Sequence, residues 1–372
     1  MSQSNMSQSN MSQSNSSQSA SQKIPVQKIP VTVLTGYLGA GKTTLLNRIL
    51  SENHGKKYAV IVNEFGEIGI DNDLIIGADE EVFEMNNGCV CCTVRGDLVR
   101  ILDGLMKRKG KFDAIIVETT GLADPAPVAQ TFFVDEDVQK NARLDAVVTV
   151  ADAKWLAERL KDAPEAKNQI AFADVIVLNK TDLVSKPELA EVEARIRGIN
   201  PYAKLHRTER CKVALSDVLE RGAFDLDRIL EIEPDFLEAG DEHDHDHDHH
   251  HGQDHDHDHH HHDHGHGLKH YHDEEMQSLS LRSDKPLDPT KFMPWLQDLV
   301  ASEGQKILRS KGILAFHDDD DRYVFQGVHM MLEGDHQRKW KADEPRQSRL
   351  VFIGRELPEQ LIRDGFERCI VS

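Results

Sequence analysis

The stretch IPVTVLTGYLGAGKTTLLNRIL, residues 29–50, joins a β-branched apolar run to a helical pattern through a glycine-rich loop. Apolar strand-like runs and helical patterns then alternate along the chain, at residues 57–65, 97–109, 112–121, 144–152 and 173–182. Continuous apolar strands that alternate with amphipathic helices are typical of a parallel sheet covered by helices on both faces. The pattern therefore predicts an α/β domain with a mostly parallel sheet, which we expect to run from residue 29 to about residue 232.

The loop within this stretch, GYLGAGKT, matches the phosphate-binding pattern G-x-x-x-x-G-K-[ST], with a strand before it and a helix after it. Gly36 and Gly41 permit a tight loop whose backbone N–H groups converge on phosphate oxygens. Lys42 can reach the β and γ phosphates, and the Thr43 hydroxyl can ligate Mg²⁺. The loop therefore predicts a P-loop nucleotide site rather than a simple glycine turn. The other loop residues predicted to contact the nucleotide are Gly39, Ala40 and Thr44.

An acidic residue ends the next buried strand, in FDAIIVETTGLADP at residues 112–125. At the carboxyl end of that strand, Glu118 could hold Mg²⁺ through water or orient the attacking water. The N–H of Gly121 could contact the γ phosphate, so that this loop would distinguish the triphosphate from the diphosphate. We therefore expect Glu118 to be a catalytic residue together with Lys42 and Thr43.

A third motif, VIVLNKTD at residues 175–182, indicates which base is bound. The Asp182 carboxylate can accept hydrogen bonds from N1–H and the N2 amine of guanine, while Lys180 lies along the ring and Asn179 braces the loop. Adenine lacks both donors, so it would leave the carboxylate unpaired and be rejected. The motif predicts GTP as the nucleotide.

Three of the five cysteines lie in one glycine-led turn, NNGCVCCTV, as Cys89, Cys91 and Cys92. Cysteines this close can pair only through a strained ring, which disfavours a structural disulfide. No histidine lies nearby in sequence to activate a nucleophile. Three thiolates suit Zn²⁺ or another thiophilic ion and leave one coordination position open. Redox chemistry and passive burial are the alternatives for these thiols.

An oxygen ligand could come from the segment NEFGEIGID, residues 63–71, because the thiols lie between it and Glu118 in the chain. Glu64 or Glu67 could ligate the thiolate-bound metal, contact Mg²⁺, or remain solvated. Cys211 and Cys369 stand alone, and we expect them to be inert.

Composition excludes several classes of protein. The net charge of −20 argues against nucleic-acid binding. No apolar run approaches the roughly 20 residues of a spanning helix, so no membrane partner is expected. The N-terminus does not resemble a signal peptide, and an odd number of cysteines suits a reducing compartment. We therefore predict a cytoplasmic protein.

Two segments of biased composition flank the predicted domain. The unit MSQSN occurs three times at the start, and residues 1–28 are predicted to be a disordered tail. In the predicted linker, residues 233–273, a run of alternating histidine and aspartate holds 16 of the 21 histidines. We interpret it as a linker that also binds metal through neutral imidazoles, so that capture fails below about pH 6.5. A merely solvated linker is the alternative. The first ligands predicted there are His243, His245 and His247.

Residues 274–372 predict a smaller C-terminal domain. Their patterns indicate a strand, a helix, three strands and a helix, in which RYVFQGVHMMLEG, residues 322–334, forms one strand. That order is typical of a small α+β domain.

The combination of these motifs carries a family resemblance. TGYLGAGKTTLLN, VNEFGEIGID, NNGCVCC, ETTGLADP and LNKTD, followed by the histidine-rich linker and RYVFQGVHMML, resemble the CobW-like zinc metallochaperone GTPases. This group is related to the GTPases that deliver nickel to urease and hydrogenase. The resemblance implies a P-loop GTPase domain, GTP hydrolysis coupled to metal transfer, and an apo-metalloprotein client. It also implies that Cys89, Cys91 and Cys92 are metal ligands and that Glu118 is the Walker B acid.

GTP, Mg²⁺ and Zn²⁺ are the expected ligands, with cobalt or nickel as alternative cargo. Our hypothesis is that GTP orders the segments around Glu64 and Gly121 and closes the thiolate site, and that hydrolysis then releases the metal. A zinc buffer with a regulatory GTP site and a P-loop kinase or ATPase are the rival functions. A nucleotide-dependent homodimer is left open. No arginine finger is evident, so we expect slow intrinsic hydrolysis.

Overall fold

The computed structural model describes residues 28–52, 55–63, 82–85, 92–107, 112–223, 276–342 and 344–371. Of these, residues 63, 82–85 and 92–95 are described by their backbone alone. The predicted linker, and the predicted tail apart from residue 28, lie outside the described residues, and the domain boundaries stay a prediction. No helix in these ranges is both long and apolar enough to cross a lipid bilayer.

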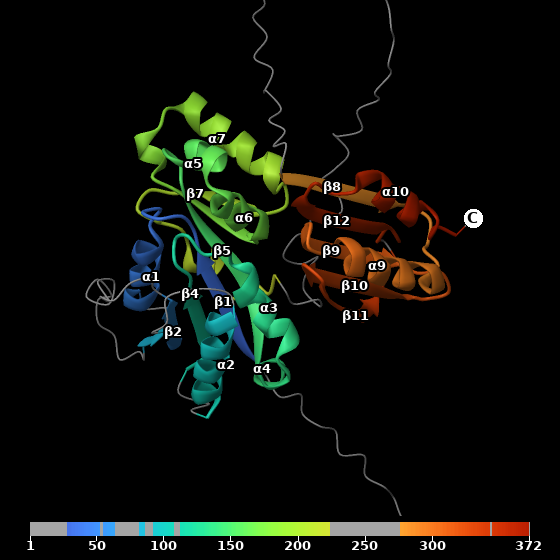
Figure 1. The fold of residues 1–372 in the computed structure, drawn as a ribbon, viewed down its shortest axis with the longest axis horizontal. Coiled ribbons are helices and arrows are strands. Elements are labelled where there is room, and N and C mark those ends of the chain that lie inside the picture. Colours follow the sequence, from blue (N-terminus) through green and yellow to red (C-terminus); the bar gives the residue numbers. More distant parts are fainter. Residues whose placement is uncertain are drawn as a thin grey trace, which may run out of the picture.

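A parallel sheet forms the centre of the first domain (Figure 1). In the described ranges it has seven strands in the order β3-β2-β4-β1-β5-β6-β7, and every neighbouring pair is parallel. The strands are β1 (Ile29–Thr35), β2 (Tyr58–Asn63), β3 (Val82–Met85), β4 (Ala114–Glu118), β5 (Ala142–Asp152), β6 (Val175–Asn179) and β7 (Lys204–Arg207). This confirms the predicted mostly parallel sheet. Because all seven strands run the same way, the loops at their carboxyl ends open at one edge of the sheet.

Helices cover the sheet and explain why its strands are apolar on both faces. Every residue of β4 and β6 is buried. Helices α2, α3 and α4 pack together as one group, and α5, α6 and α7 as another. The helices are α1 (Lys42–Ser51), α2 (Cys92–Met106), α3 (Ala126–Val134), α4 (Glu136–Asn141), α5 (Leu156–Asp162), α6 (Pro164–Phe172) and α7 (Lys186–Ile199).

The second domain is an antiparallel sheet with two helices, as predicted for an α+β domain. Its strand order is β11-β10-β9-β12-β8. The elements are β8 (Met276–Ser283), α9 (Pro289–Glu303), β9 (Ile307–Ala315), β10 (Asp321–Val328), β11 (Met331–Lys339), β12 (Ser348–Arg355) and α10 (Glu359–Glu367). Phe292 of α9 is fully buried in its core, against Phe316 and Phe325.

The predicted strand order of this domain is wrong in one place, because residues 322–334 do not form a single strand. They form most of a hairpin of β10 and β11, in which Val328 pairs with Met331. The turn between them uses His329 at φ +52°, which is a backbone conformation usually taken by glycine or asparagine. Four strands therefore separate the two helices of this domain.

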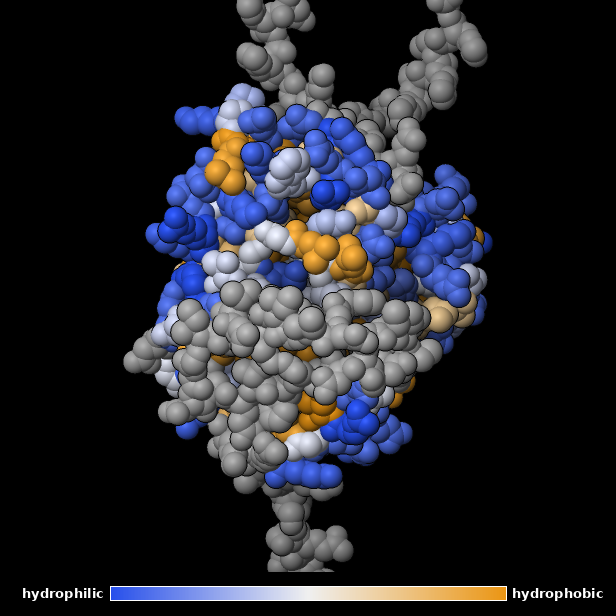
Figure 2. Space-filling model, turned by 60° about the vertical axis from the view of Figure 1, so that its left-hand side comes forward, coloured by the Kyte–Doolittle hydropathy of each residue, from blue (hydrophilic) through white to orange (hydrophobic). Residues whose placement is uncertain are grey.

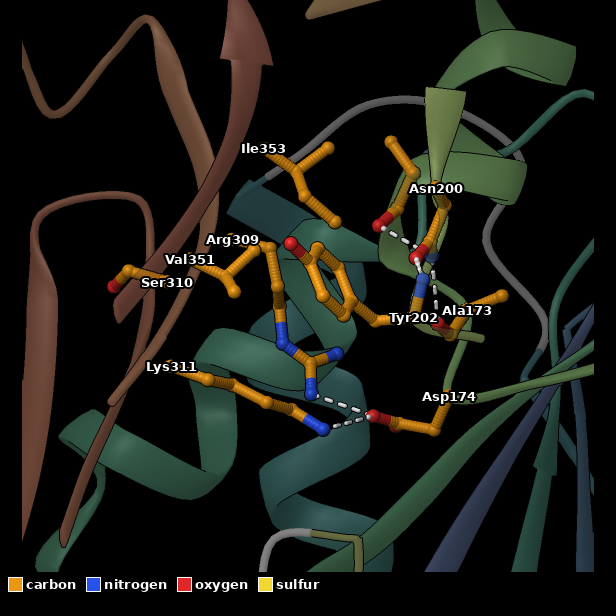
Figure 3. Close-up of a pocket in the computed structure, with 10 residues that line it drawn as sticks. Ala173, Asp174, Asn200, Tyr202, Arg309, Ser310, Lys311, Val351 and Ile353 are labelled. Carbon is orange, nitrogen blue, oxygen red and sulfur yellow. Dashed lines mark hydrogen bonds and ion pairs between the residues drawn. The ribbon is translucent and has the colours of Figure 1, made fainter. Parts of the chain in front are cut away.

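The two domains share a buried interface that contains charged groups. Apolar residues of the second sheet, such as Leu308 and Val351, belong to the same core cluster as the first domain. Figure 3 shows Arg309 and Lys311 of β9 pointing at Asp174, which immediately precedes β6. Arg309 Nη2 and Lys311 Nζ donate to Asp174 Oδ1 at 2.6 Å and 3.1 Å. The second sheet is thus joined by ion pairs to the residue that immediately precedes β6, the strand next to β7 at the end of the first sheet.

Candidate functional site

The loop between β1 and α1 has a backbone that requires glycine at two positions. Gly36 and Gly41 have φ values of +138° and +117°. A Cβ atom at Gly36 would lie 2.1 Å from the carbonyl oxygen of Val150, and one at Gly41 would lie 2.6 Å from Asn179 Nδ2. Since neither position has room for a side chain, the loop is compact before any ligand is considered.

Helix α1 begins directly after this loop, so its first backbone N–H groups and its positive end face the loop. Lys42 and Thr43 form its first turn and are half-buried, whereas Thr44 is exposed. Lys42 Nζ donates to the carbonyl oxygen of Gly36 at 2.9 Å, across the loop. A cation, a hydroxyl and the backbone N–H groups at a helix start are suited to phosphate.

The loop after β4 lies directly on the loop after β1. The N–H of Thr119 donates to the carbonyl oxygen of Leu34 at 2.9 Å, and the two hydroxyls of Thr119 and Thr35 are 2.9 Å apart. A Cβ atom at Gly121 would lie only 2.6 Å from the backbone nitrogen of Leu38. Glu118, at the end of β4, is 6% exposed. The predicted γ-phosphate contact and the predicted phosphate loop are therefore neighbours.

The residues after β6 join the same site through side-chain hydrogen bonds. Asn179 Nδ2 donates to the carbonyl oxygen of Ala40 at 3.0 Å, and Asn179 Oδ1 accepts from the N–H of Cys211 at 2.8 Å. Lys180 Nζ donates to the carbonyl oxygen of Gly39 at 2.8 Å. Asp182 lies in the short turn η2 (Thr181–Leu183) and is exposed. Three of the predicted motifs thus meet at one edge of the sheet.

Two further residues of this site were not predicted from sequence. Asp152, the last residue of β5, accepts from Lys180 Nζ at 2.7 Å and so fixes the ammonium group between two loops. Cys211 is fully buried with its Sγ 3.4 Å from the carbonyl oxygen of Gly41. Burial raises the pKa of Cys211 to about 11, so the thiol stays protonated. Neither residue stands in a recognisable motif, because each contributes through contacts that only the fold creates.

Large apolar side chains are exposed around these loops. Leu38, Leu122, Trp155 and Leu183 are between 47% and 60% exposed. Figure 2 shows apolar residues forming small islands on a mainly polar face of the molecule. Because these four residues follow β1, β4, β5 and β6 in turn, the edge with the phosphate loop also presents apolar surface.

Most of the predicted metal ligands lie outside the described residues. These are Cys89, Cys91, Glu64, His243, His245 and His247, and the alternative Glu67. Cys92 is the first residue of α2, where only the backbone is described. Within the described ranges, no group of three or more histidine, cysteine or acidic side chains is placed to hold a metal ion.

The described chain ends at the last residues of β2 and β3, shortly before Glu64 and the three cysteines. Asn63, the last residue of β2, pairs with Met85, the last residue of β3, and both strands run parallel to β4 and β1. The chain leading to Glu64 and the chain leading to Cys89 therefore both start from the edge of the sheet that carries the phosphate loop.

Comparisons with known families place the chain. Residues 30–207 match the family described as CobW/HypB/UreG, nucleotide-binding domain. Residues 276–370 match the cobalamin synthesis protein cobW C-terminal domain. This chain belongs to the CobW/HypB/UreG family, and it carries the CobW C-terminal domain as well. The resemblance read from the motifs is thereby confirmed.

Individual relatives agree with this assignment. The chain is 34% identical over 340 residues to the zinc chaperone YjiA of Escherichia coli, covering 90% of this chain and 96% of that protein. It is 34% identical over 325 residues to zinc-regulated GTPase metalloprotein activator 1 of Schizosaccharomyces pombe, covering 81% and 75% of the two chains. The crystal structure of Zn(II)-bound YjiA GTPase from E. coli matches with a TM-score of 0.68 at 29% identity, covering 93% of this chain and all of that one.

Proposed function

We propose that this protein is a GTP-hydrolysing metallochaperone that binds Zn²⁺ through Cys89, Cys91 and Cys92 and transfers it to a client apo-metalloprotein. One observation carries the proposal: the loops after β1, β4 and β6 are in direct contact at one edge of the sheet. Strands β2 and β3, which lead to Glu64 and the thiols, end at the same edge. The zinc chaperones and zinc-regulated GTPases among its relatives support this function.

In the proposed GTPase reaction, the phosphates lie over the start of α1 and are held by Lys42 and by backbone N–H groups of the loop. The Thr43 hydroxyl and the Glu118 carboxylate are hard oxygen ligands of the kind that Mg²⁺ takes. When bound, the ion neutralises charge on the phosphate oxygens. Glu118 also orients the attacking water, and Gly121 contacts the γ phosphate only in the GTP state.

Base recognition is assigned to Asp182, with Lys180 alongside the ring. The contacts of Lys180 with Gly39 and Asp152 hold its stem next to the phosphate loop. Replacement of Asp182 by asparagine exchanges a double acceptor for a mixed donor and acceptor. We expect wild-type protein to prefer GTP over ATP by at least about 100-fold, and Asp182→Asn to lose most of that preference. A preference of wild-type protein for ATP that Asp182→Asn leaves unchanged would point to an adenine nucleotide enzyme instead.

The metal site is assigned to the three thiolates, with Glu64 as the oxygen ligand and Zn²⁺ as cargo. Zinc titration against a chromophoric chelator should give one tight site in wild-type protein, and the Cys89→Ala, Cys91→Ala, Cys92→Ala variant should lack it. Cys369→Ser is the matched control, because it also removes a thiol. Cys369 is buried in the second domain, where its Sγ donates to the carbonyl oxygen of Gly365. Equal zinc content in the triple variant and the control would exclude the thiol site.

The remaining assignments follow from the same function. The histidine tract, which begins with His243, His245 and His247, is proposed to collect metal weakly near neutral pH. Cobalt or nickel is the alternative cargo, and the metal content of untagged protein distinguishes them. A cytoplasmic location and a nucleotide-dependent homodimer stay predictions, and light scattering with a GTP analogue and with GDP tests the second.

A further inference from the structure

A buried glutamine of α6 holds the loop that follows β4. Gln169 is 1% exposed, and its Nε2 donates to the carbonyl oxygens of Gly121 and Ala123, both at 3.1 Å. The carbonyl oxygen of Gln169 in turn accepts from the Thr149 hydroxyl at 2.7 Å, so the residue is fixed to β5. The loop that touches Leu38 of the phosphate loop is therefore held by a side chain of α6, which is itself fixed to β5.

The neighbouring residue of α6 makes a second contact with the same loop. Asn168 Nδ2 donates to Asp124 Oδ2 at 2.8 Å, and Asp124 Oδ1 accepts from the N–H of Ala126 at the start of α3. Two adjacent side chains of α6 thus set both the backbone of the loop and its exit into α3.

The second domain orients Asn168. Arg355, the last residue of β12, donates from Nη2 to Asn168 Oδ1 at 2.7 Å. This donor fixes which end of the amide faces Asp124, because the oxygen is taken by the guanidinium and the NH₂ group remains for the carboxylate. Arg355, Asn168 and Asp124 form a continuous chain of hydrogen bonds from the second sheet to the loop after β4.

Other contacts keep α6 against the second domain. The His329 ring, in the β10–β11 turn, lies 5.7 Å from the Phe172 ring at the end of α6. Arg309 Nη1 donates to the carbonyl oxygen of Phe172 at 2.9 Å. A shift of the second domain would therefore move α6, and with it the two side chains that hold the loop.

We propose that Gln169, Asn168 and Arg355 are positioning residues for GTP hydrolysis, and that the second domain thereby helps to set the geometry of the loop at Gly121. The inference rests on the proposed GTPase function. It assigns to the C-terminal domain a part in the nucleotide cycle, through Arg355, although that residue belongs to a different sheet from the nucleotide site.

The test compares GTP turnover in full-length Arg355→Ala, Asn168→Ala and the double variant with that of Arg363→Ala. Arg363 is the control because it pairs only with Glu359 on α10 among the described residues. We expect kcat to fall roughly 2- to 30-fold in both single variants, with little change in the affinity for GDP. The double variant should be no worse than either single variant, because both break one chain of hydrogen bonds. Arg355→Lys, which can donate one hydrogen bond to the amide, should restore part of the activity.

The outcomes separate this inference from the function on which it rests. If wild-type protein does not hydrolyse GTP, the proposed function fails and this inference fails with it. If wild-type protein hydrolyses GTP and Arg355→Ala behaves like Arg363→Ala, only the positioning role is overturned. A fall in GDP affinity or in melting temperature that matches the fall in kcat would mean a general loss of structure, and would also overturn it. Asn168→Ala gives an independent reading, since it removes the contact from within the first domain.

Discussion

Replacement of Asp174 by asparagine should weaken the protein far more than the loss of an ordinary ion pair. The Asp174 side chain is 2% exposed, and the partner side chains of Arg309 and Lys311 are 4% and 9% exposed. Burial opposes ionisation of this carboxyl group, but the charges of Arg309 and Lys311 outweigh it and hold the pKa of Asp174 below its ordinary value. Asparagine keeps the shape of the side chain but has one acceptor oxygen, whereas Asp174 uses both of its oxygens, Oδ2 for the N–H of Val147 and Oδ1 for Arg309 and Lys311. The substitution therefore removes the charge and one of the two acceptors.

The expected loss of stability in Asp174→Asn follows from the groups that remain buried after the substitution. Two buried cations lose their shared carboxylate, and removal of one partner of a buried pair typically costs about 3–5 kcal/mol. This is a large fraction of the roughly 5–15 kcal/mol that stabilises most proteins. Asp137→Asn is the control, because Asp137 Oδ1 also lies 3.1 Å from a lysine, Lys140, but that pair is exposed. Exposed pairs of this kind often contribute nothing measurable.

Urea unfolding, followed by tryptophan fluorescence and circular dichroism, measures the effect. The chain has three tryptophans, of which Trp155 lies in the first domain and Trp295 and Trp340 in the second. We expect Asp174→Asn to lower the unfolding midpoint for both domains, because the pair joins them, and Asp137→Asn to leave it unchanged. A loss below about 1 kcal/mol in Asp174→Asn would refute the view that this cluster is a desolvated link between the domains.

Three further predictions concern single positions. Gly41→Ala should lower nucleotide affinity and stability more than Gly39→Ala, since both have positive φ but only Gly41 has Asn179 in the way; titration with GDP and thermal melts compare them. In folded protein, Cys211 should resist alkylation by iodoacetamide at pH 8, because burial raises its pKa to about 11. Mass spectrometry that finds Cys211 alkylated in folded protein would contradict this prediction. Burial lowers the pKa of His329, so the unfolded chain takes up this proton first as pH falls below about 6.5. Between pH 7.5 and pH 5.5, the free energy of unfolding should therefore fall more in wild-type protein than in His329→Asn. Urea melts that show equal falls in the two proteins would contradict this prediction.

The fold was predictable where burial leaves a mark in the sequence. Strands covered on both faces must be continuously apolar, so β1, β4, β5 and β6 could be identified from their residues alone. The unpredicted strands carry a weaker signal. β3 has only four residues. β7, with the sequence KLHR, has no fully buried residue because it is the outermost strand on its side of the sheet.

The hairpin of β10 and β11 and the charged interface could not be predicted from the sequence, for a different reason. The turn at His329 and Met330 contains no glycine, asparagine or proline, so nothing in the sequence separates the two strands. Arg309 and Lys311 are two residues apart on β9 and so point to the same face. Charged residues on a strand usually indicate a solvated face. Only the partner, Asp174, distant in sequence, reveals that this face is buried.

The candidate site also contains residues that the sequence predicts and residues that only the fold brings together. The loop after β1 and the residues after β4 and β6 could be proposed from sequence as one nucleotide site, because binding of phosphate and guanine demands particular residues at fixed spacing. Gln169, Asn168 and Arg355 could not, since amides and arginines are common and their role comes from the distance between segments. The single contact from Arg355 to Asn168 joins residues 187 positions apart in the chain.

Coupling between the metal and the nucleotide is the central claim, and the affinity for Zn²⁺ in the two nucleotide states tests it most directly. Chelator competition would be run on one protein sample saturated with a non-hydrolysable GTP analogue or with GDP, both with Mg²⁺. We predict that the zinc affinity is greater with the GTP analogue by roughly 5- to 150-fold, the range of typical allosteric coupling. The Cys89→Ala, Cys91→Ala, Cys92→Ala variant should show no such difference. Equal zinc affinity of wild-type protein in the two states would contradict the account.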